Sequence, residues 1–445
     1  MKFSLERINK NILLIGLMLL LFRNSSFAQT GIPQPFEIIF IIVSLLTLVD
    51  LIVNNKWKEF FTSISKKLWI AIYILLGSIL GGWLIAVFVR NIPTTTNTVH
   101  EFGAFLAAAT SGILILYYSR NDHLYIKKCV YALSVPGIYI LAVLVPEAAY
   151  SLHLAQDGAF HGFTNNVHIA SKTLLIPLFL CIAYSLISSD KYWRRVLCII
   201  GAILLTALIF WTVQRAALLA VIVGAFIVWV AVAYRDRNWK KTILNAVLLI
   251  LILMLGFFSV PHEGKKAATN RVLNFDGDQM PQVELKDKSL IEVIKNSIQK
   301  KKDTTPATTI ASLSDEKKSP EPRFQIWGHY LPIVFNNPLG LGPNTHMDAV
   351  VVFAKGIFIN PGPHNTYLTM WLWGGIIGLL SFLYLVINGF KYIYASIKKE
   401  ILPVHLVILG SLVAFCITMF FNDGLQLYWF WILLALALRY ETTTH

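Results

Sequence analysis

His364 is the residue of this sequence that is best suited to acid–base chemistry. It follows a rigid Asn-Pro-Gly-Pro stretch and precedes a long apolar run. Gly375 comes eleven residues later and Gly378 follows it, a spacing that places the three residues near one face of a helix. Glycines on that face let a helix or a lipid chain approach closely. Because imidazole accepts protons near neutral pH, we predict that His364 deprotonates or positions a hydroxyl group; a helix-capping or interfacial histidine is the alternative.

Three basic residues are candidates for binding an anionic ligand. Arg215 lies in a short connection after Gln214, where a guanidinium is costly unless it reaches lipid headgroups or meets an anion. Arg323 opens an aromatic segment, and Lys172 lies near the start of the apolar run at 167–187. Guanidinium groups make paired hydrogen bonds to phosphate oxygens, so we predict a phosphate ligand. Contact with lipid headgroups or with solvent is the alternative for each residue.

Aromatic residues near these positions are candidates for stacking on sugar rings. Tyr367 and Trp371 lie at the start of the apolar run after His364, and Trp327 lies one helical turn after Arg323. Aromatic residues are also expected at membrane interfaces, which is the alternative interpretation. The sequence contains no paired carboxylates, phosphate-binding Gly-rich loop or His/Cys metal cluster. We therefore expect neither a cofactor nor a metal.

Membrane-spanning helices must position all of these residues. The chain has 445 residues, of which 56% are hydrophobic and 14% charged, whereas about a quarter of the residues in a soluble domain are charged. Apolar runs close to the roughly 20 residues that cross a bilayer recur along the chain. The sequence therefore predicts an all-α integral membrane protein of about twelve transmembrane helices. We place these spans at 11–28, 35–54, 68–89, 101–118, 128–147, 167–187, 194–212, 215–234, 241–260, 367–390, 402–421 and 425–440.

The first predicted span also has features of a secretory signal. Lys2, Arg7 and Lys10 precede its apolar run, and Ser26-Phe27-Ala28 follows it. Cleavage after Ala28 would leave an odd number of spans, so we favour a retained helix.

The net charge of +14 follows the topology of a membrane protein. One alternate set of short connections carries only Arg23, Arg90 and Arg215, and the other set is rich in lysine and arginine. This positive-inside pattern places both termini in the cytoplasm and predicts contact with anionic membrane lipid; no nucleic-acid motif accompanies the charge, so no nucleic-acid partner is expected. The basic residues of the rich set are Lys56, Lys58, Lys66, Lys67, Arg120, Lys127, Lys128, Lys191, Arg194, Arg195, Arg235, Arg237, Lys240, Lys241, Lys391, Lys398 and Lys399.

One connection is far longer than the others and divides the chain into three parts. Residues 1–260 hold nine spans, 261–366 form a large loop on the outer side, and 367–445 hold three spans and a cytoplasmic tail. The middle of the loop, about 299–322, is polar and Lys-rich and predicts a flexible insert. Residues 289–300 have the spacing of a short surface helix. The aromatic second part of the loop is the predicted location of chemistry, since long ordered loops tend to be functional.

These motifs resemble a known family. His364-Asn365, nine residues and then Gly375-Ile376-Ile377-Gly378 match the pattern H-[NSQ]-x9-G-x-x-[GTY] of bacterial O-antigen ligases. The resemblance includes the twelve-helix layout and the loop between spans nine and ten. It also covers Gln214-Arg215 and the run from Arg323 and Trp327 to Asn337-Pro338-Leu339-Gly340-Leu341-Gly342. The chain thus resembles the superfamily of O-antigen ligases and polymerases, which act on lipid-linked glycans.

The resemblance implies a metal-independent glycosyltransferase of the GT-C type in the bacterial inner membrane, with its active site facing the periplasm. The donor would be a glycan on undecaprenyl pyrophosphate, and the acceptor a sugar hydroxyl of lipid A-core, in lipopolysaccharide biosynthesis. By similarity, His364 would act on the acceptor, Arg215 and Arg323 would bind the pyrophosphate, and Asn365, Gly375 and Gly378 would complete the motif.

Two other functions stay open. A polymerase or an O-linked protein oligosaccharyltransferase of the same superfamily would use the same donor site with a different acceptor. A transporter or flippase would show charged groups at the middle of the membrane, and the predicted spans contain few ionisable residues. We expect the ligase activity.

Overall fold

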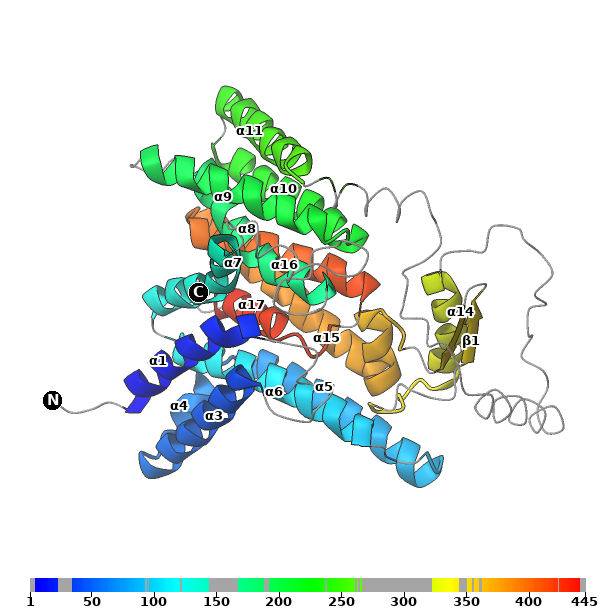
Figure 1. Cartoon of the computed structure of the whole chain (residues 1–445). Helices are drawn as coiled ribbons and strands as arrows, with labels where there is room; N and C mark the ends of the chain where they lie inside the picture. Colours follow the sequence, from blue (N-terminus) through cyan, green and yellow to red (C-terminus); the bar gives the residue numbers. More distant parts are fainter. Residues whose placement is uncertain are drawn as a thin grey trace.

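The computed structural model is a bundle of helices, from one end of which a further helix and a small hairpin project (Figure 1). It describes residues 5–22, 34–92, 94, 96–120, 122–143, 167–187, 192–236, 238–260, 262, 265, 322–343, 350–353, 356–359, 362–422 and 424–440. The predicted surface helix at 289–300, nearly all of the predicted flexible insert at 299–322 and the Ser26-Phe27-Ala28 stretch lie outside these residues.

Ten helices lie in the described residues of the first half of the chain. They are α1 (Leu5–Met18, continued by a 3-10 turn at Leu19–Phe22), α3 (Pro35–Val53), α4 (Trp57–Thr62), α5 (Lys66–Leu84, continued by a π turn at Ile85–Val89), α6 (Thr96–Tyr118), α7 (His123–Val143), α8 (Val167–Leu186), α9 (Tyr192–Trp211), α10 (Arg215–Asp236) and α11 (Trp239–Phe258).

The second half adds α14 (Pro322–Asn336), α15 (Thr366–Lys399), α16 (Pro403–Phe421) and α17 (Tyr428–Leu438). Each of the twelve predicted spans overlaps a helix of the structure. Among the described residues, nine helices are long and apolar enough to cross a membrane: α3, α5, α6, α8, α9, α10, α11, α15 and α16. The membrane class is therefore confirmed, and the count of twelve stays a prediction.

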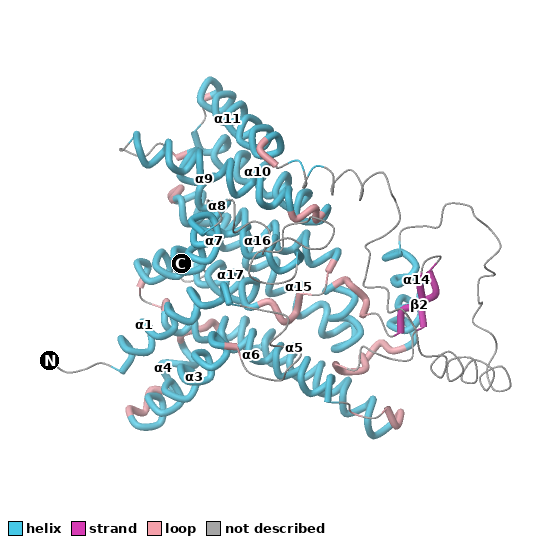
Figure 2. Tube along the Cα trace, viewed as in Figure 1, coloured by secondary structure: helices cyan, strands magenta, loops and turns pink. Residues whose placement is uncertain are grey.

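A hairpin is the exception to the all-α prediction. Strands β1 (Val350–Phe353) and β2 (Gly356–Ile359) pair antiparallel, with Val350 opposite Ile359. Valine, isoleucine and phenylalanine favour strands, so the run of three valines carried this signal. The hairpin lies beside α14 and outside the bundle of spans (Figure 2). The predicted all-α class thus holds for the bundle of spans, and the two short strands lie between α14 and α15.

The centre of the bundle is formed by α15, α16 and α17. All eleven residues of α17 are buried, and this helix packs against α6, α15 and α16. By contrast, α11 packs mainly on α9 and exposes apolar residues such as Ile250 and Phe258. Exposed apolar side chains are expected where lipid is the solvent. The bundle therefore has a closely packed centre and a lipid-facing periphery.

A group of charged residues joins helices at the end of the bundle where α1 begins and α17 ends. The Lys10 ammonium lies 3.3 Å from Glu6 and 3.5 Å from Asp122, and Lys56 lies 3.0 Å from Asp50. Arg120 pairs with both Glu6 and Glu59. We name these seven residues the inner cluster: Glu6, Lys10, Asp50, Lys56, Glu59, Arg120 and Asp122.

The end of the chain reaches the same region, because Arg439 Nε donates to the Ser119 carbonyl at 3.1 Å. The described ends of the chain therefore lie on one side, which is the relation that the charge pattern predicts. That this side faces the cytoplasm stays a prediction.

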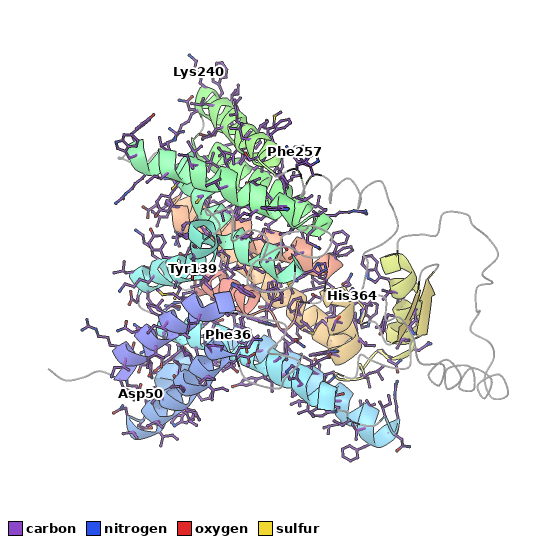
Figure 3. All side chains as sticks on the ribbon, viewed as in Figure 1. Phe36, Asp50, Tyr139, Lys240, Phe257 and His364 are labelled. Carbon is purple, nitrogen blue, oxygen red and sulfur yellow. The ribbon has the colours of Figure 1, made fainter. Side chains whose placement is uncertain are left out.

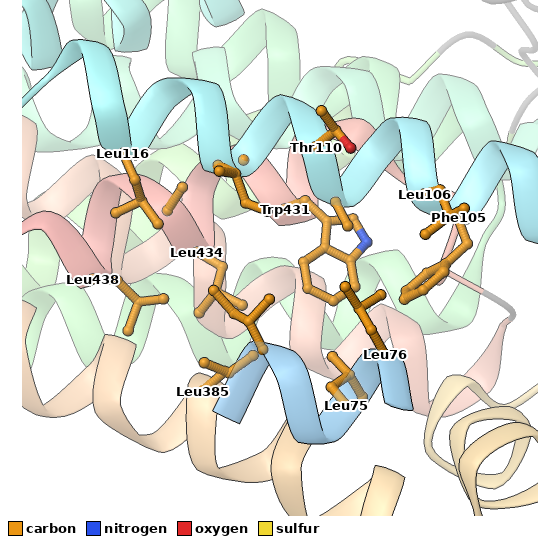
Figure 4. A pocket seen from close by; sticks show the side chains of 15 residues that line it. Leu75, Leu76, Phe105, Leu106, Thr110, Leu116, Leu385, Trp431, Leu434 and Leu438 are labelled. Carbon is orange, nitrogen blue, oxygen red and sulfur yellow. The ribbon is translucent and has the colours of Figure 1, made fainter. Parts of the chain in front are cut away.

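An apolar groove lies between α5 and α6, with α15 and α17 forming its floor (Figure 4). Its outer limit is Phe105, whose ring contacts Trp373 edge-on with ring centroids 5.9 Å apart. The groove therefore ends beside Trp373, near the start of α15. Its lining includes Ile72, Leu76, Leu106, Thr110, Leu385 and Leu434.

Candidate functional site

His364 lies in a strained turn immediately before α15. Its φ is 47°, in the left-handed region that non-glycine residues rarely adopt. The side chain is half-buried and lies at the end of the bundle that faces α14, opposite Asp50 and Lys240 (Figure 3). Residues in such conformations cost roughly 1–3 kcal/mol and gather at functional sites. The turn at residues 362–365, which we call the His364 turn, is therefore the centre of the candidate site.

Asn365 holds the His364 turn from the side of α15. Its side-chain oxygen accepts hydrogen bonds from the backbone N–H groups of Tyr367 and Leu368, both at 3.0 Å. Asparagine is a favoured N-cap because it satisfies N–H groups that the helix cannot. In addition, Thr366 Oγ1 donates to the Asn422 carbonyl at the end of α16, at 2.8 Å. The start of α15 is thus fixed to the turn and to α16.

The structure corrects the predicted face that joined His364 to the glycines. His364 is not helical, and Gly375 interrupts α15 with φ 63° and ψ −167°. Helical spacing therefore does not carry over from His364 to Gly378. The physical reason is that glycine adopts this conformation readily, so a short first segment of α15, residues 366–374, is set off from the rest.

A loop from α14 fills this break in α15. In a continuous helix the Ile376 N–H would donate to the Leu372 carbonyl. Instead, Ile376 donates to the Pro338 carbonyl at 2.9 Å, and Leu372 accepts from the Leu341 N–H at 2.7 Å. The Trp373 carbonyl likewise accepts from the Gly342 N–H at 2.9 Å. Residues 338–342, which we name the break loop, thus satisfy the backbone groups that the break leaves without helical partners.

Glycines make this backbone contact sterically feasible. A Cβ atom on Gly375 would overlap the Pro338 carbonyl oxygen, and one on Gly340 would lie 2.5 Å from the Gly375 nitrogen. A Cβ on Gly378 would lie 2.8 Å from Ser78 Oγ of α5. The motif glycines therefore bring the break loop and α5 against α15. Sequence reasoning predicted the close approach of a helix, which α5 makes at Gly378, but not the approach of the break loop at Gly375.

Arg215 is the first residue of α10 and is exposed. The turn before it is also strained, because Val213 has a φ of 54°, which is rare for a β-branched residue. Gln214, the other residue of the Gln214-Arg215 element, is 6% exposed and is packed inside the protein. The arrangement presents a guanidinium at the start of a helix, where the partial positive charge of the helix also favours anions.

Helices α10 and α15 begin at the same end of the bundle. Their other ends meet where the Arg235 guanidinium donates to the Lys399 carbonyl at 3.3 Å, and both helices pack against α16. The starts of α10 and α15 therefore lie on either side of the end of α16 (Figure 1). The structure thus brings Arg215 and His364 to one face of the bundle from residues about 150 apart in the chain.

Helix α14 brings Arg323 and Trp327 to this face. Arg323 lies in its first turn, and the helix packs against α15. The indole N–H of Trp327 donates to the Pro363 carbonyl at 3.0 Å, directly before His364. On the same helix, burial lowers the pKa of the half-buried His329, so this imidazole is neutral at pH 7.

Lys172 lies in the second turn of α8 and is only 4% exposed. A buried ammonium is costly unless a partner compensates it, so simple exposure to lipid headgroups does not describe this residue. Helix α8 packs against α16 and α9. Helix α8 also contacts α10, so Lys172 and Arg215 lie on neighbouring helices.

The remaining aromatic candidates pack near the start of α15. The Tyr367 hydroxyl donates to the Cys416 carbonyl at 3.1 Å. Trp371 meets Phe335 of α14 edge-on at 5.0 Å, and its indole N–H has no hydrogen-bond partner among the described residues. The predicted sugar contacts thus stay predictions, with the polar atoms of Tyr367 and Trp327 already bonded to backbone carbonyls.

Residues 200–383 match the family model named Wzy_C, which describes an O-antigen ligase. The resemblance to O-antigen ligases is confirmed. The matched segment contains the starts of α10 and α15, α14 and the break loop, whereas Lys172 lies before it. No curated protein matches the chain. In the described ranges, no group of three or more histidine, cysteine, aspartate or glutamate residues is arranged to bind a metal.

Proposed function

We propose that the protein is an O-antigen ligase, which transfers a glycan from undecaprenyl pyrophosphate to a sugar hydroxyl of lipid A-core at the periplasmic face of the bacterial inner membrane. The observation that carries the proposal is His364, held in a left-handed turn at the start of α15 within the O-antigen ligase segment. Strain of this kind is retained where the surroundings fix a residue for a task.

In this reaction the acceptor oxygen bonds to the anomeric carbon of the donor sugar, and the bond from that carbon to the pyrophosphate oxygen breaks. The hydroxyl proton passes to His364, and undecaprenyl pyrophosphate leaves. An imidazole at this position is matched to that proton transfer at neutral pH.

Negative charge grows on the pyrophosphate as it leaves. Arg215 at the start of α10 and Arg323 in the first turn of α14 supply guanidinium groups for it, and Lys172 is a further cation. Fixed cations and helix N-termini stabilise developing charge without reorganisation. This assignment lets the protein act without a metal, since its own side chains provide the positive charge.

A reconstitution tests the proposal. Purified protein in liposomes receives an undecaprenyl-pyrophosphate glycan with or without lipid A-core, and products are identified by mass spectrometry. We expect glycan on lipid A-core with the wild type and none with His364→Ala. His329→Gln is the matched control, because it removes a second histidine from the same face of the protein.

The other outcomes assign the alternatives. Longer lipid-linked chains in the absence of lipid A-core would identify a polymerase, and glycan on an added acceptor protein would identify a protein oligosaccharyltransferase. Absence of any covalent product with all three acceptors would contradict glycosyl transfer and favour a transporter.

A further inference from the structure

Trp327 contacts the chain immediately before His364. Its indole N–H donates to the Pro363 carbonyl at 3.0 Å, and its ring meets Phe420 edge-on with centroids 5.4 Å apart. A tryptophan N–H that is withdrawn from water needs an acceptor, and the Pro363 carbonyl is one. The side chain is thus held by a polar contact at one edge and an aromatic contact at another.

The Pro363 carbonyl and the His364 N–H belong to the same peptide unit. Because a peptide unit is planar, a hydrogen bond that fixes the carbonyl also fixes the axis about which φ of His364 turns. That φ is 47°, so the backbone does not adopt it by default. The cap at Asn365 fixes the following residue. The backbone is therefore anchored on both sides of His364, by Trp327 before it and by the Asn365 cap after it.

Helix α14 is attached to α15 at two places. Trp327 bonds to the His364 turn, and the break loop, which follows the end of α14, bonds to Leu372, Trp373 and Ile376. These attachments lie on either side of the first segment of α15. The segment and the turn are consequently braced by α14 at both of their ends.

We propose that Trp327 is a positioning residue, which sets the orientation of His364 through the Pro363 carbonyl. This role differs from the sugar contact predicted for Trp327, since its N–H is engaged with the backbone. The effect on glycosyl transfer rests on the proposed function, whereas the effect on the imidazole itself does not.

The test removes the N–H and keeps the ring. Trp327→Phe is the first variant, and 3-benzothienylalanine at position 327 is the second, because its sulfur replaces N–H in a ring of nearly the same shape. Trp229→Phe is the matched control: Trp229 Nε1 donates to the Thr242 carbonyl at 3.1 Å, at the opposite end of the bundle from His364. All variants are full-length and reconstituted in liposomes.

Two readouts are measured on each variant. The first is the rate at which diethyl pyrocarbonate modifies His364, followed by peptide mass spectrometry and referred to the exposed His100. The second is kcat and KM for glycan transfer. For both Trp327 variants we expect an altered rate of His364 modification and a kcat lower by about 10-fold with unchanged KM, since small misplacement of a catalytic group is costly. Trp229→Phe should match the wild type in both readouts.

The outcomes separate this inference from the proposed function. If His364 modification changes in the Trp327 variants but no variant or wild type transfers glycan, the positioning role stands and the proposed function fails. If the benzothienyl protein matches the wild type in modification rate and kcat, the positioning role is wrong. Equal changes in Trp229→Phe would also overturn it, because the effect would then follow from the loss of any such bond.

Discussion

The His364 turn and the inner cluster stabilise opposite ends of the bundle by different means. In the inner cluster, charged side chains from α1, α3, α4 and the connections after α3 and α6 form ion pairs, such as Lys56 with the buried Asp50 at 3.0 Å. The hydrogen bonds that hold the His364 turn and the start of α15 run to backbone groups: the Pro363 carbonyl, the N–H groups after Asn365, and the backbone of the break in α15.

This difference separates assembly from ligand binding. Where cations are paired with carboxylates of the protein, they hold helices together and have little capacity left for a ligand. At the His364 turn, backbone hydrogen bonds and glycines fix the geometry instead. The comparison therefore predicts that substitutions at the end that holds the His364 turn change transfer, and that substitutions in the inner cluster change stability.

The largest effect is expected for His364→Ala. Loss of the proton acceptor should lower kcat for glycan transfer by about 10³-fold, within the range of general base catalysis. The free energy of unfolding should change little, because the side chain is half-buried. The reconstituted assay measures the first quantity, and thermal unfolding in detergent measures the second. If His364→Ala still transferred glycan, His364 would have no part in the reaction.

Gly375→Ala tests the break in α15. The added Cβ would overlap the Pro338 carbonyl, and alanine is strained at a φ of 63°, so we expect a loss of stability of about 3 kcal/mol together with loss of transfer. Gly81→Ala is the control, because a Cβ there meets no atom within 4 Å. Thermal unfolding is measured for both variants. Equal unfolding temperatures would contradict the role of the break loop in holding α15.

Arg215→Lys keeps the charge but removes the planar fork of the guanidinium. We expect a loss of roughly 10- to 30-fold in kcat/KM for the lipid-linked donor, since lysine cannot make paired bonds to phosphate oxygens. Transfer is measured over a range of donor concentrations. Unchanged kcat/KM would exclude a bidentate phosphate contact at this position.

Asp50→Asn tests the other side of the comparison. It removes the charge that pairs with Lys56, whose pKa is raised because the hydrogen bond and charge of Asp50 outweigh the lowering by burial. We expect stability to fall by about 1–3 kcal/mol, while kcat of the folded protein stays the same. A fall in kcat without a change in stability would show that the inner cluster acts on the site.

The smallest effect is expected for His329→Gln. Burial lowers the pKa of His329 in the folded protein, so the unfolded chain binds the proton first as the pH falls. The stability that the neutral imidazole contributes is therefore present above pH ~6.5 and lost as the pH falls below it. Thermal unfolding between pH 7 and 5 should decline less in the variant, and transfer at pH 7 should change less than about twofold.

The sequence predicted the helices well and the geometry of the site less well. Spans follow from the length of apolar runs, so each predicted span overlaps a helix of the structure. The His364 motif also indicated the family. The break at Gly375 was missed because a glycine in an apolar run is equally consistent with a packed helix and with an interruption.

The partners of the break could not be predicted from spacing. They are carbonyl and N–H groups of residues 338–342. Because nearly all residue types carry the same backbone groups, the amino-acid sequence does not indicate which of these groups form hydrogen bonds. The one available signal was the glycine pair of the break loop, Gly340 and Gly342, which adopt φ 83° and 68°. The hairpin at 350–359 was not predicted because its strands have only four residues each, far fewer than the apolar runs that indicate membrane spans.

The break in α15 also has a consequence for the biogenesis of the protein. A carbonyl or N–H group without a partner costs several kcal/mol in hydrocarbon, so the first segment of α15 cannot enter the bilayer alone as a finished element. The break loop, which completes it, leaves the ribosome earlier in the chain, as does Ser78 of α5. Vectorial synthesis therefore delivers the complementary backbone before the helix that requires it, and this order favours insertion of α15 directly into its final contacts.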